Sequence, residues 1–232
     1  MTALIFTLKT SLSFKLDCSR LTPDQLAGLT LQQIQNLSLF NQKNSPKVAD
    51  FFEVSGDDAK HTQNKIAENI IFKNCNKKLD YIGHKMSHGT ITIEGAAGDF
   101  LGAGMQGGTI VCRGSAGDRT GDQIRRGLIL IDGDAGDYCA SRMIAGTIGV
   151  HGEVGNYAGF AMKRGTLLLT KLPKLHATIQ DCGAHTLPFL ALLFRSFRPL
   201  PTLFNQIQTN RVQRFAGDLA CNGNGEILVI SS

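Results

Sequence analysis

Hydrophobic residues in the middle of the chain recur with two periods, one of two residues and one of 19 residues. Between residues 89 and 165 a glycine begins each 19-residue unit, and a short segment of strand-like composition follows it. Each segment carries two apolar positions separated by one residue. These two columns are Ile91, Ile110, Ile129, Ile148, Leu167 and Ile93, Cys112, Ile131, Val150, Leu169. Alternate residues of a strand share one face, so the pattern predicts one short strand per unit with both columns in the core.

The remainder of each unit has the composition of turns. A second glycine, a small residue and a Gly-Asp or Gly-Asn pair follow the strand, and such residues adopt positive φ or bond to nearby amides. A bulky apolar residue near the end of each unit is predicted to enter the core: Met105, Ile124, Met143 and Met162. An acidic column consists of Asp80, Asp99, Asp118 and Asp137, followed by Asn156. Stacked carboxylates repel one another, so we expect each to accept hydrogen bonds from amides of its own turn.

A unit of 19 residues without a helical period is too short for a four-stranded propeller blade and suits one coil of a stack. The sequence therefore predicts a mainly β fold, a right-handed parallel β-helix (solenoid) of 19-residue coils. A weakened copy of the unit begins one period earlier, at Ile70, as expected for a terminal coil that caps the stack.

Three parts of a single structural domain are expected. Residues 1–69 would form an N-terminal β and short-helix cap, residues 70–170 the repeats, and residues 171–232 a helix and strand tail that packs on the solenoid. Because a stack of strands has an open edge at each end, segments that cover those edges are expected.

The N-terminal part shows several local signals. Residues 3–8 and 11–17 alternate like the two strands of a hairpin. Thr22 followed by a proline predicts the start of a short helix, and Thr30 with Gln33 predicts a capping box. Two polar stretches, 41–45 and 57–69, read as loops, and a strand within 51–56 is expected to lead into the first coil.

The C-terminal part contains an apolar helix candidate at residues 187–197, with Thr186 as a possible N-cap and Pro199 as a stop signal. Its apolar face is predicted to consist of Phe189, Leu192, Leu193 and Phe197. The outward strand positions Val111, Leu130 and Leu168 form an apolar stripe on the coils. We expect this helix, or a partner protein, to cover that stripe, and we expect a last strand at residues 226–230.

Composition narrows the class of protein. The chain has 232 residues, of which 42% are hydrophobic, and a net charge of +5, which fits one domain with a real core and does not favour a dedicated nucleic-acid binder. Its six cysteines are scattered, which predicts free thiols in a reducing cytoplasm. We identify neither a signal-peptide pattern nor an apolar run long enough to span a membrane. These features predict a cytoplasmic protein.

Several short motifs suggest a catalytic or metal site but fit the repeat better. Residues 102–107 match GxGxxG, yet no helical period follows, so we interpret the glycines as corners. Residues 132–137 resemble part of a calcium loop but lack its spacing and its closing glutamate. His84, His88 and His151 do not have the spacing of metal ligands, and the latter two are expected to be exposed. We predict no catalytic residue and no metal site in this chain.

Basic residues gather near the end of successive units and are expected along one edge of the stack. They are Lys85, His88, Arg125, Arg126, Arg142, Lys163 and Arg164. One interpretation is a solvated edge or a charged interface with another protein. The other is a surface for an anionic ligand or partner, because rows of Arg and Lys suit carboxylates and phosphates. The sequence leaves both open.

The repeat resembles the GxGxG solenoid of glutamate synthase large subunits. A fuller resemblance is to the C subunit of formylmethanofuran dehydrogenase and to the C subunit of the formyltransferase/hydrolase complex of methylotrophic bacteria. It rests on residues 22–26 (TPDQL), 52–56 (FEVSG), the repeats of 89–169 and the tail RFAGDLACNGNGEILV at 214–229. The tail is the specific part. The degenerate first coil and the short linker before the tail depart from the family pattern.

The resemblance implies a non-catalytic scaffold within a cytoplasmic hetero-oligomeric complex of one-carbon metabolism. The implied partners are an amidohydrolase-like subunit, a formyltransferase subunit and one further subunit, which are the A, D and B subunits of such a complex. The complex moves formyl groups between tetrahydromethanopterin, a methanofuran-like carrier (methylofuran) and formate, and no cofactor is expected on this chain. The carrier's polyglutamate tail makes the basic edge a candidate place to hold it.

Alternatives of other classes remain at this point. The parent complex is either the hydrolase or a molybdenum or tungsten dehydrogenase, and the abundant Asn and Gln favour a mesophilic hydrolase. A structural module like that of glutamate synthase would need a glutaminase partner. A stand-alone β-helix enzyme acting on polysaccharide would need an acidic, aromatic-lined groove, and the chain has no Trp and three Tyr.

Overall fold

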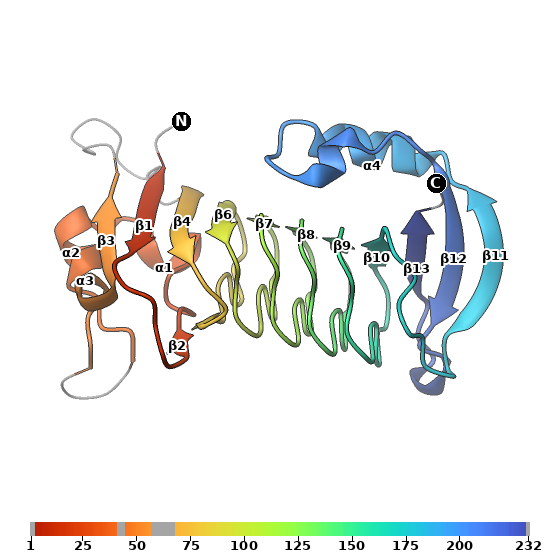
Figure 1. Ribbon diagram of the computed structural model, residues 1–232, viewed down its shortest axis with the longest axis horizontal. Coiled ribbons are helices and arrows are strands. Elements are labelled where there is room, and N and C mark those ends of the chain that lie inside the picture. The colour runs from red at the N-terminus through yellow and green to blue at the C-terminus, as the bar shows by residue number, and fades with distance from the viewer. Residues whose placement is uncertain (1–2, 41–44, 57–67, 231–232) are drawn as a thin grey trace.

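The structure of the protein is a computed structural model that describes residues 3–40, 45–56 and 68–230. The chain winds into an elongated stack (Figure 1). One sheet of 11 strands runs along this stack in the order β11-β12-β13-β10-β9-β8-β7-β6-β4-β1-β3. Pairing is parallel from β1 through β4 and β6–β10 to β13. At the two ends, the pairs β1–β3, β11–β12 and β12–β13 are antiparallel. The fold is therefore mainly β, as predicted.

The repeat strands occupy the positions that the 19-residue period predicts. They are β6 (Thr90–Gly95), β7 (Thr109–Cys112), β8 (Leu128–Ile131), β9 (Thr147–Val150) and β10 (Thr166–Leu169). Each strand pairs with the next at an offset of one period, so that Ile110 lies opposite Ile129 and Ile129 opposite Ile148. Both predicted inward columns are buried, and so are Met105, Ile124, Met143 and Met162. The core assignment is confirmed.

The turns of successive coils are also hydrogen-bonded to one another. The amide of Gly102 donates to the carbonyl of Ile82 at 2.8 Å, and the amide of Gly121 donates to that of Leu101 at 2.7 Å. Gly102 has φ +63°, and a Cβ there would lie 2.4 Å from Ile129 Cδ1, so a side chain at this corner would displace the end of Ile129. Glycines do not supply every positive φ, however. Two positions earlier in each coil, side-chain-bearing residues adopt the same conformation: Tyr81, Phe100, Arg119, Tyr138 and Tyr157.

The acidic column accepts amides from the next coil, and the prediction of bonds within its own turn is wrong. Asp80 Oδ1 accepts from the amide of Asp99 at 2.8 Å, and Asp118 Oδ1 accepts from that of Asp137 at 2.9 Å. The cause is the parallel stacking, which places the amide of residue i+19 directly beside each carboxylate. Lys15 forms ion pairs with Asp80 (3.5 Å) and Asp99, which offsets the repulsion between these two carboxylates.

The first coil is longer than predicted. Strands β4 (Asn69–Cys75) and β5 (Leu79–Asp80) belong to it, and Ile70 pairs with Ile91, 21 residues away, although Asp80 bonds to Asp99, 19 residues away. The register predicted for Ile70 is therefore wrong by two residues. The extra residues lie near an irregularity of the pairing between Lys73 and Cys75.

The N-terminal strands do not form the predicted hairpin. Strand β1 (Leu4–Leu8) lies between β4 and β3 (Phe52–Ser55), whereas β2 (Leu16–Asp17) pairs with β5 in a separate two-stranded sheet. Burial of aromatic side chains explains this placement, because Phe6 stacks on Phe72 and meets the edge of Phe52. Strand β3 thus lies beyond β1 and does not pair with the first coil.

Short helices complete this end of the stack: α1 (Pro23–Leu26), α2 (Leu31–Gln35) and α3 (Val48–Phe51). The predicted Thr22 cap and the capping box of Thr30 and Gln33 are both confirmed. The predicted loops 41–45 and 57–69 lie mostly outside the described residues.

The tail closes the other end of the stack. Its elements are β11 (Gln180–Thr186), α4 (Phe189–Phe197), the 3₁₀ turns η2 (Leu203–Gln206) and η3 (Leu219–Cys221), β12 (Arg211–Gly217) and β13 (Gly225–Ile230). Strand β13, which contains the predicted last strand, pairs in parallel with β10 and takes the place of a further coil. Strands β12 and β11 then add in antiparallel fashion, so this edge of the coils is covered by strands.

Helix α4 crosses the outward side of the coils (Figure 1) and forms a second apolar cluster with Leu130 and Leu168, as predicted. Val111, the third residue of the predicted stripe, is buried but does not belong to this cluster. The face that it buries differs from the predicted one, because Leu190, Phe194 and Phe197 are buried whereas Phe189 and Leu192 are exposed. The N-cap is Pro188, without a side-chain cap, and Thr186 ends β11. Gly149 leaves a gap in the stripe, which the ring of Phe204 fills.

All six cysteines are free thiols, as predicted. No helix within the described ranges has the length and the apolarity needed to span a membrane.

Candidate functional site

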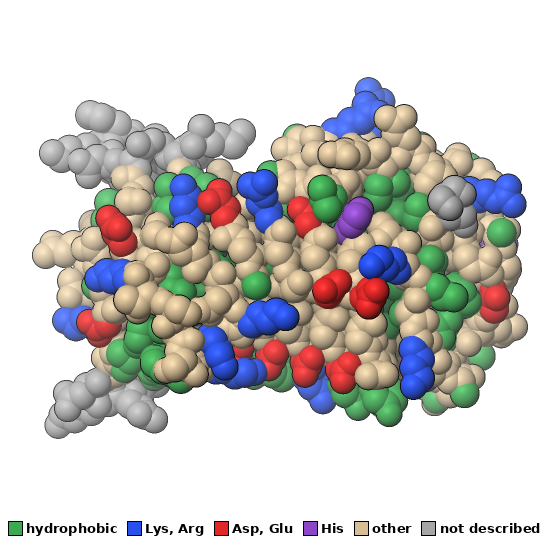
Figure 2. Space-filling model, in the orientation of Figure 1, with side chains coloured by type: hydrophobic (Ala, Val, Ile, Leu, Met, Phe, Trp, Pro, Cys, Tyr) green, Lys and Arg blue, Asp and Glu red, His purple; other side chains and the backbone are tan. Residues whose placement is uncertain are grey.

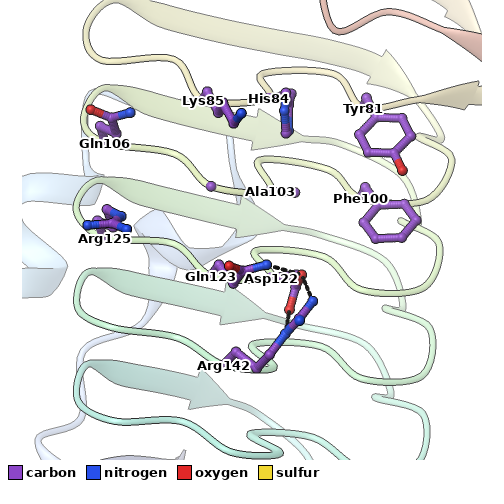
Figure 3. Close-up of a pocket in the computed structure, with 11 residues that line it drawn as sticks. Tyr81, His84, Lys85, Phe100, Ala103, Gln106, Asp122, Gln123, Arg125 and Arg142 are labelled. Atoms are coloured by element: carbon purple, nitrogen blue, oxygen red, sulfur yellow. Dashed lines mark hydrogen bonds and ion pairs between the residues drawn. The ribbon is translucent and has the colours of Figure 1, made fainter.

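A hollow of about 410 Å³ opens on the turns of four successive coils (Figure 3). Among the residues lining it are Tyr81, His84, Lys85, Phe100, Gln106, Asp122, Gln123, Arg125 and Arg142. Three of the predicted basic residues, Lys85, Arg125 and Arg142, are thereby brought to one place although they span 58 positions of the chain (85 to 142, inclusive). The 19-residue register, rather than proximity in sequence, assembles this site.

The three cations of the hollow have different environments. Arg142 turns toward Asp122 (Figure 3), with Nε 3.0 Å from Oδ1 and Nη2 2.5 Å from Oδ2. Lys85 and Arg125 are exposed, and within the described part of the chain neither side chain has an ion-pair partner. Two uncompensated positive charges therefore face the hollow.

Asp122 is a buried carboxylate held ionised by its neighbours. Burial alone would raise its pKa, but hydrogen bonds from Arg142, Ser141 and Gln123 outweigh that effect and keep the pKa below its ordinary value. The Ser141 hydroxyl donates at 2.7 Å and the Gln123 amide at 3.2 Å. A carboxylate that is ionised and fully engaged is suited to fixing Arg142 in place and poorly suited to proton transfer.

An aromatic wall borders the charged side of the hollow. The rings of Tyr81 and Phe100 are stacked at a centroid distance of 4.6 Å with an interplanar angle of 3° (Figure 3). The two rings belong to a column of residues spaced 19 positions apart in the sequence. In the same column, Cζ of Arg119 lies 4.7 Å from the centroid of the Tyr138 ring, and Tyr138 stacks on Tyr157. Sequence reasoning missed this column. The signal was present, because these five residues recur at the same position of successive units.

His84 adds a neutral polar group. Burial lowers the pKa of its imidazole, and the charge of Lys85 lowers it further. Its Nδ1 atom is buried and makes no well-formed hydrogen bond with the described residues. A neutral imidazole beside a lysine can donate or accept one hydrogen bond to a polar group of a ligand.

The other predicted basic residues lie outside the hollow. His88 pairs with Asp24 at 3.3 Å, and Lys163 donates to the carbonyl of Cys221 at 3.1 Å. Arg126 and Arg164 are exposed and share one register position, but Ala145 stands between them in the intervening coil. The predicted edge is thus interrupted at this register position. Figure 2 shows basic side chains at several separate places on the visible face.

The motifs set aside in the sequence have structural roles. Asp132 accepts from the hydroxyl of Thr202 at 2.5 Å and from the amide of Leu203 at 2.8 Å, which fastens the tail to the coils. Asp134 accepts from the amide of Glu153 in the next coil. Across the described residues, no group of three or more His, Cys, Asp or Glu could hold a metal ion. The exposed cations Lys85 and Arg125 and the stacked rings of Tyr81 and Phe100 are groups that suit an anion with a planar or apolar part.

Comparison with known proteins gives matches of two kinds. No family model matches the chain. The C subunit of the molybdenum-containing formylmethanofuran dehydrogenase 1 of Methanosarcina barkeri is 34% identical over 99 residues, which is 42% of this chain and 32% of that protein. The C subunit of the tungsten-containing formylmethanofuran dehydrogenase 2 of Methanococcus maripaludis is 29% identical over 98 residues, 42% of this chain and 34% of that protein. The matched part spans about a third of the length of these relatives.

A solved structure matches over nearly the full length. It is a chain in the X-ray crystal structure of the formyltransferase/hydrolase complex (FhcABCD) from Methylorubrum extorquens in complex with methylofuran. The superposition has a TM-score of 0.69 and 28% sequence identity, and it covers 98% of this chain and 100% of that chain. The chain is therefore similar in part of its sequence to the C subunits of formylmethanofuran dehydrogenases, and similar over nearly its full length to a chain of the formyltransferase/hydrolase complex.

Proposed function

We propose that this chain is the non-catalytic structural C subunit of a cytoplasmic complex that transfers and hydrolyses formyl groups in one-carbon metabolism. The observation that carries the proposal is the similarity in fold to a chain of the formyltransferase/hydrolase complex, which covers 98% of this chain and 100% of that chain. The partners in this proposal are an amidohydrolase-like subunit, a formyltransferase subunit and the remaining B subunit of the same complex.

The architecture fits a scaffold. Coils joined by hydrogen bonds in strands and turns form a rigid post, with closing elements at both ends. We propose that the coils wind as a right-handed parallel β-helix, the hand that parallel crossovers favour. The cap, the repeats and the tail are proposed to fold as one structural domain, since the sheet runs through all three. We therefore expect the cap, the repeats and the tail to unfold together in one transition.

The hollow supports a contribution to binding a methanofuran-like carrier. The homologous complex was solved with methylofuran, and the exposed cations Lys85 and Arg125 suit carboxylates of a polyanionic tail. Arg126 and Arg164 would extend the contact along neighbouring coils. Tetrahydromethanopterin, which such a complex uses, is proposed to bind elsewhere, and this chain is proposed to hold no cofactor of its own.

A second candidate is the C subunit of a molybdenum or tungsten formylmethanofuran dehydrogenase. The curated matches favour it, since they belong to enzymes of that type. A solenoid module like that of glutamate synthase has no comparable support. The two complexes differ in what they do with the formyl group, so the activity of the purified complex separates them.

The test is purification of the complex from its native source through a tag on the full chain. Mass spectrometry of the co-eluting chains should identify an amidohydrolase-like protein and a formyltransferase at fixed stoichiometry, and the complex should release formate from the formylated carrier. A chain that elutes alone, or one that is catalytically active alone, would refute the scaffold role. Formate oxidation with a redox dye would favour the dehydrogenase.

The carrier contact is tested in the same preparation. Hydrogen bonds to charged groups contribute about 1.5–3 kcal/mol each, so Lys85→Gln with Arg125→Gln should lower the affinity for the carrier at least about tenfold. The matched control is Arg113→Gln, an exposed arginine outside the hollow. Equal retention of carrier in both variants, with the complex intact, would remove this contact from the proposal.

A further inference from the structure

Helix α4 is apolar on two sides, and only one of them is covered. Leu190, Phe194 and Phe197 are buried against the coils. On the other side, 44% of Phe189 and 70% of Leu192 remain exposed, and residues three apart on a helix are neighbours. Phe189 and Leu192 are not part of the apolar cluster that α4 forms with the coils.

The segment of the chain that contains this exposed face is rich in arginine. From residue 182 to residue 217 the sequence contains four arginines and no Asp or Glu. Arg214 pairs with Glu226, whereas Arg195, Arg198 and Arg211 are exposed and have no ion-pair partner within the described ranges. Figure 2 shows basic side chains projecting above the part of the molecule that α4 occupies. An apolar centre with a basic rim is an arrangement that recognises an apolar segment with acidic flanks.

We propose that the exposed side of α4, defined by Phe189, Leu192, Arg195 and Arg198, is the docking surface for an acidic amphipathic segment of another protein of the complex. The inference rests on the proposed role as a subunit, and it adds the location of one contact and the chemistry of the partner. Apolar side chains of the partner cover Phe189 and Leu192, and its carboxylates pair with the arginines at the rim.

Two other occupants fit the surface less well. A symmetric pair formed through α4 of a second copy would place these arginines against one another, which costs energy. On α4 a membrane surface would meet only two large exposed apolar side chains, because the other aromatic residues of this nine-residue helix are buried in the chain. Charge complementarity therefore favours a different, acidic protein.

The experiment uses the full chain within its native complex and a photo-crosslinking amino acid at position 192. Digestion and mass spectrometry should find crosslinks to one partner chain, within a peptide that carries apolar residues flanked by Asp or Glu. Crosslinks to a second copy of this chain, or to a peptide without carboxylates, would overturn the proposal. A matched crosslinker at Leu172, which is 64% exposed but lies outside α4, should not label that peptide.

Binding is then measured with variants. Leu192→Glu, or Arg195→Glu with Arg198→Glu, should weaken binding of the crosslinked partner by about ten- to thirtyfold, and the wild-type affinity should fall as salt is raised. Leu172→Glu and Lys77→Glu are the controls and should leave the affinity unchanged. Full affinity of the α4 variants for the partner would refute the docking surface. The docking surface would also be refuted if the wild-type chain bound vesicles containing anionic phosphatidylglycerol and these substitutions abolished that binding. Absence of any partner for the wild-type chain would instead refute the proposed subunit role.

Discussion

Gly149 allows a quantitative test of how the outer layer seats on the coils. Its position in the repeat is outward, and its counterparts are Val111, Leu130 and Leu168. The repeat alone would favour a branched residue here, because Gly in a strand costs roughly 0.5–1 kcal/mol. The structure predicts the opposite, since a Cβ at this position would lie 3.0 Å from Phe204 Cζ and 2.8 Å from Leu130 Cδ2.

We expect Gly149→Val to destabilise the protein. Displacing a fully buried ring by overpacking costs about 1–3 kcal/mol, and the gain in strand propensity returns at most about 1 kcal/mol. Phe204→Ala removes the ring and should cost about 3–5 kcal/mol. In that background the clash with the ring is absent, the end of the Leu130 side chain can move into the space that the ring leaves, and the valine fills part of the cavity. Gly149→Val should therefore become stabilising there, with a coupling energy of about 2–3 kcal/mol.

The assay is urea unfolding followed by far-ultraviolet circular dichroism for the wild type, both single variants and the double variant. Because the outer layer can open separately from the coils, hydrogen exchange of the amides in α4 and η2 should be measured in parallel. Those amides should lose protection in Gly149→Val and regain part of it in the double variant relative to Phe204→Ala. The reasoning is refuted if Gly149→Val changes stability by the same amount and sign in both backgrounds.

Three further predictions concern the acidic column, the hollow and the thiols. Asp80→Ala leaves the amide of Asp99 without its acceptor and should reduce stability by about 1–3 kcal/mol in thermal unfolding. Asp80→Asn retains an acceptor oxygen and should cost less. Equal losses in the two variants would contradict the stabilising role of the hydrogen bond between Asp80 and the amide of Asp99. The folded-state pKa of Asp122 lies below its ordinary value. The stability that the ionised Asp122 contributes is therefore present at neutral pH and is lost as pH falls below about 4 through the folded pKa. Arg142→Gln should make the free energy of unfolding less dependent on pH in that acid range, and an unchanged pH dependence would contradict this role of Arg142. Burial raises the pKa of the Cys139 thiol to about 12, so a thiol reagent at pH 8 should modify Cys139 only as the protein unfolds. Mass spectrometry measures the extent of modification. Rapid modification of the native protein would show that the interior of the coils is accessible to the reagent.

The repeat made the core readable from sequence, because each coil places the same register position in the same environment. Two kinds of local pattern were sufficient here. The 19-residue repeat predicts the strands and the buried Ile and Met columns, and residues within one helical turn of each other predict the caps of α1 and α2. The sequence also predicted that Lys85, Arg125 and Arg142 share an edge. It did not predict the hollow, since Asp122 and the Tyr81–Phe100 stack act there only through contacts between coils.

The errors have a common physical origin. Asp80 was expected to bond within its own turn, but parallel stacking brings the amide of the following coil closer. The hairpin at residues 3–17 was expected from alternation, but burial of Phe6 between Phe52 and Phe72 separates its two strands. In both cases a contact between residues far apart in sequence outweighs a local preference.

By itself, then, the sequence determined the period, the strands, the inward columns and the family resemblance, because all of these are properties of a repeated local pattern. The tertiary structure decided the parts that occur once. It placed β13 beside β10 as a further parallel strand, filled the gap at Gly149 with Phe204, and left Leu192 exposed among arginines. These features depend on how the non-repeating tail folds back on the coils, and no periodicity in the chain encodes that docking.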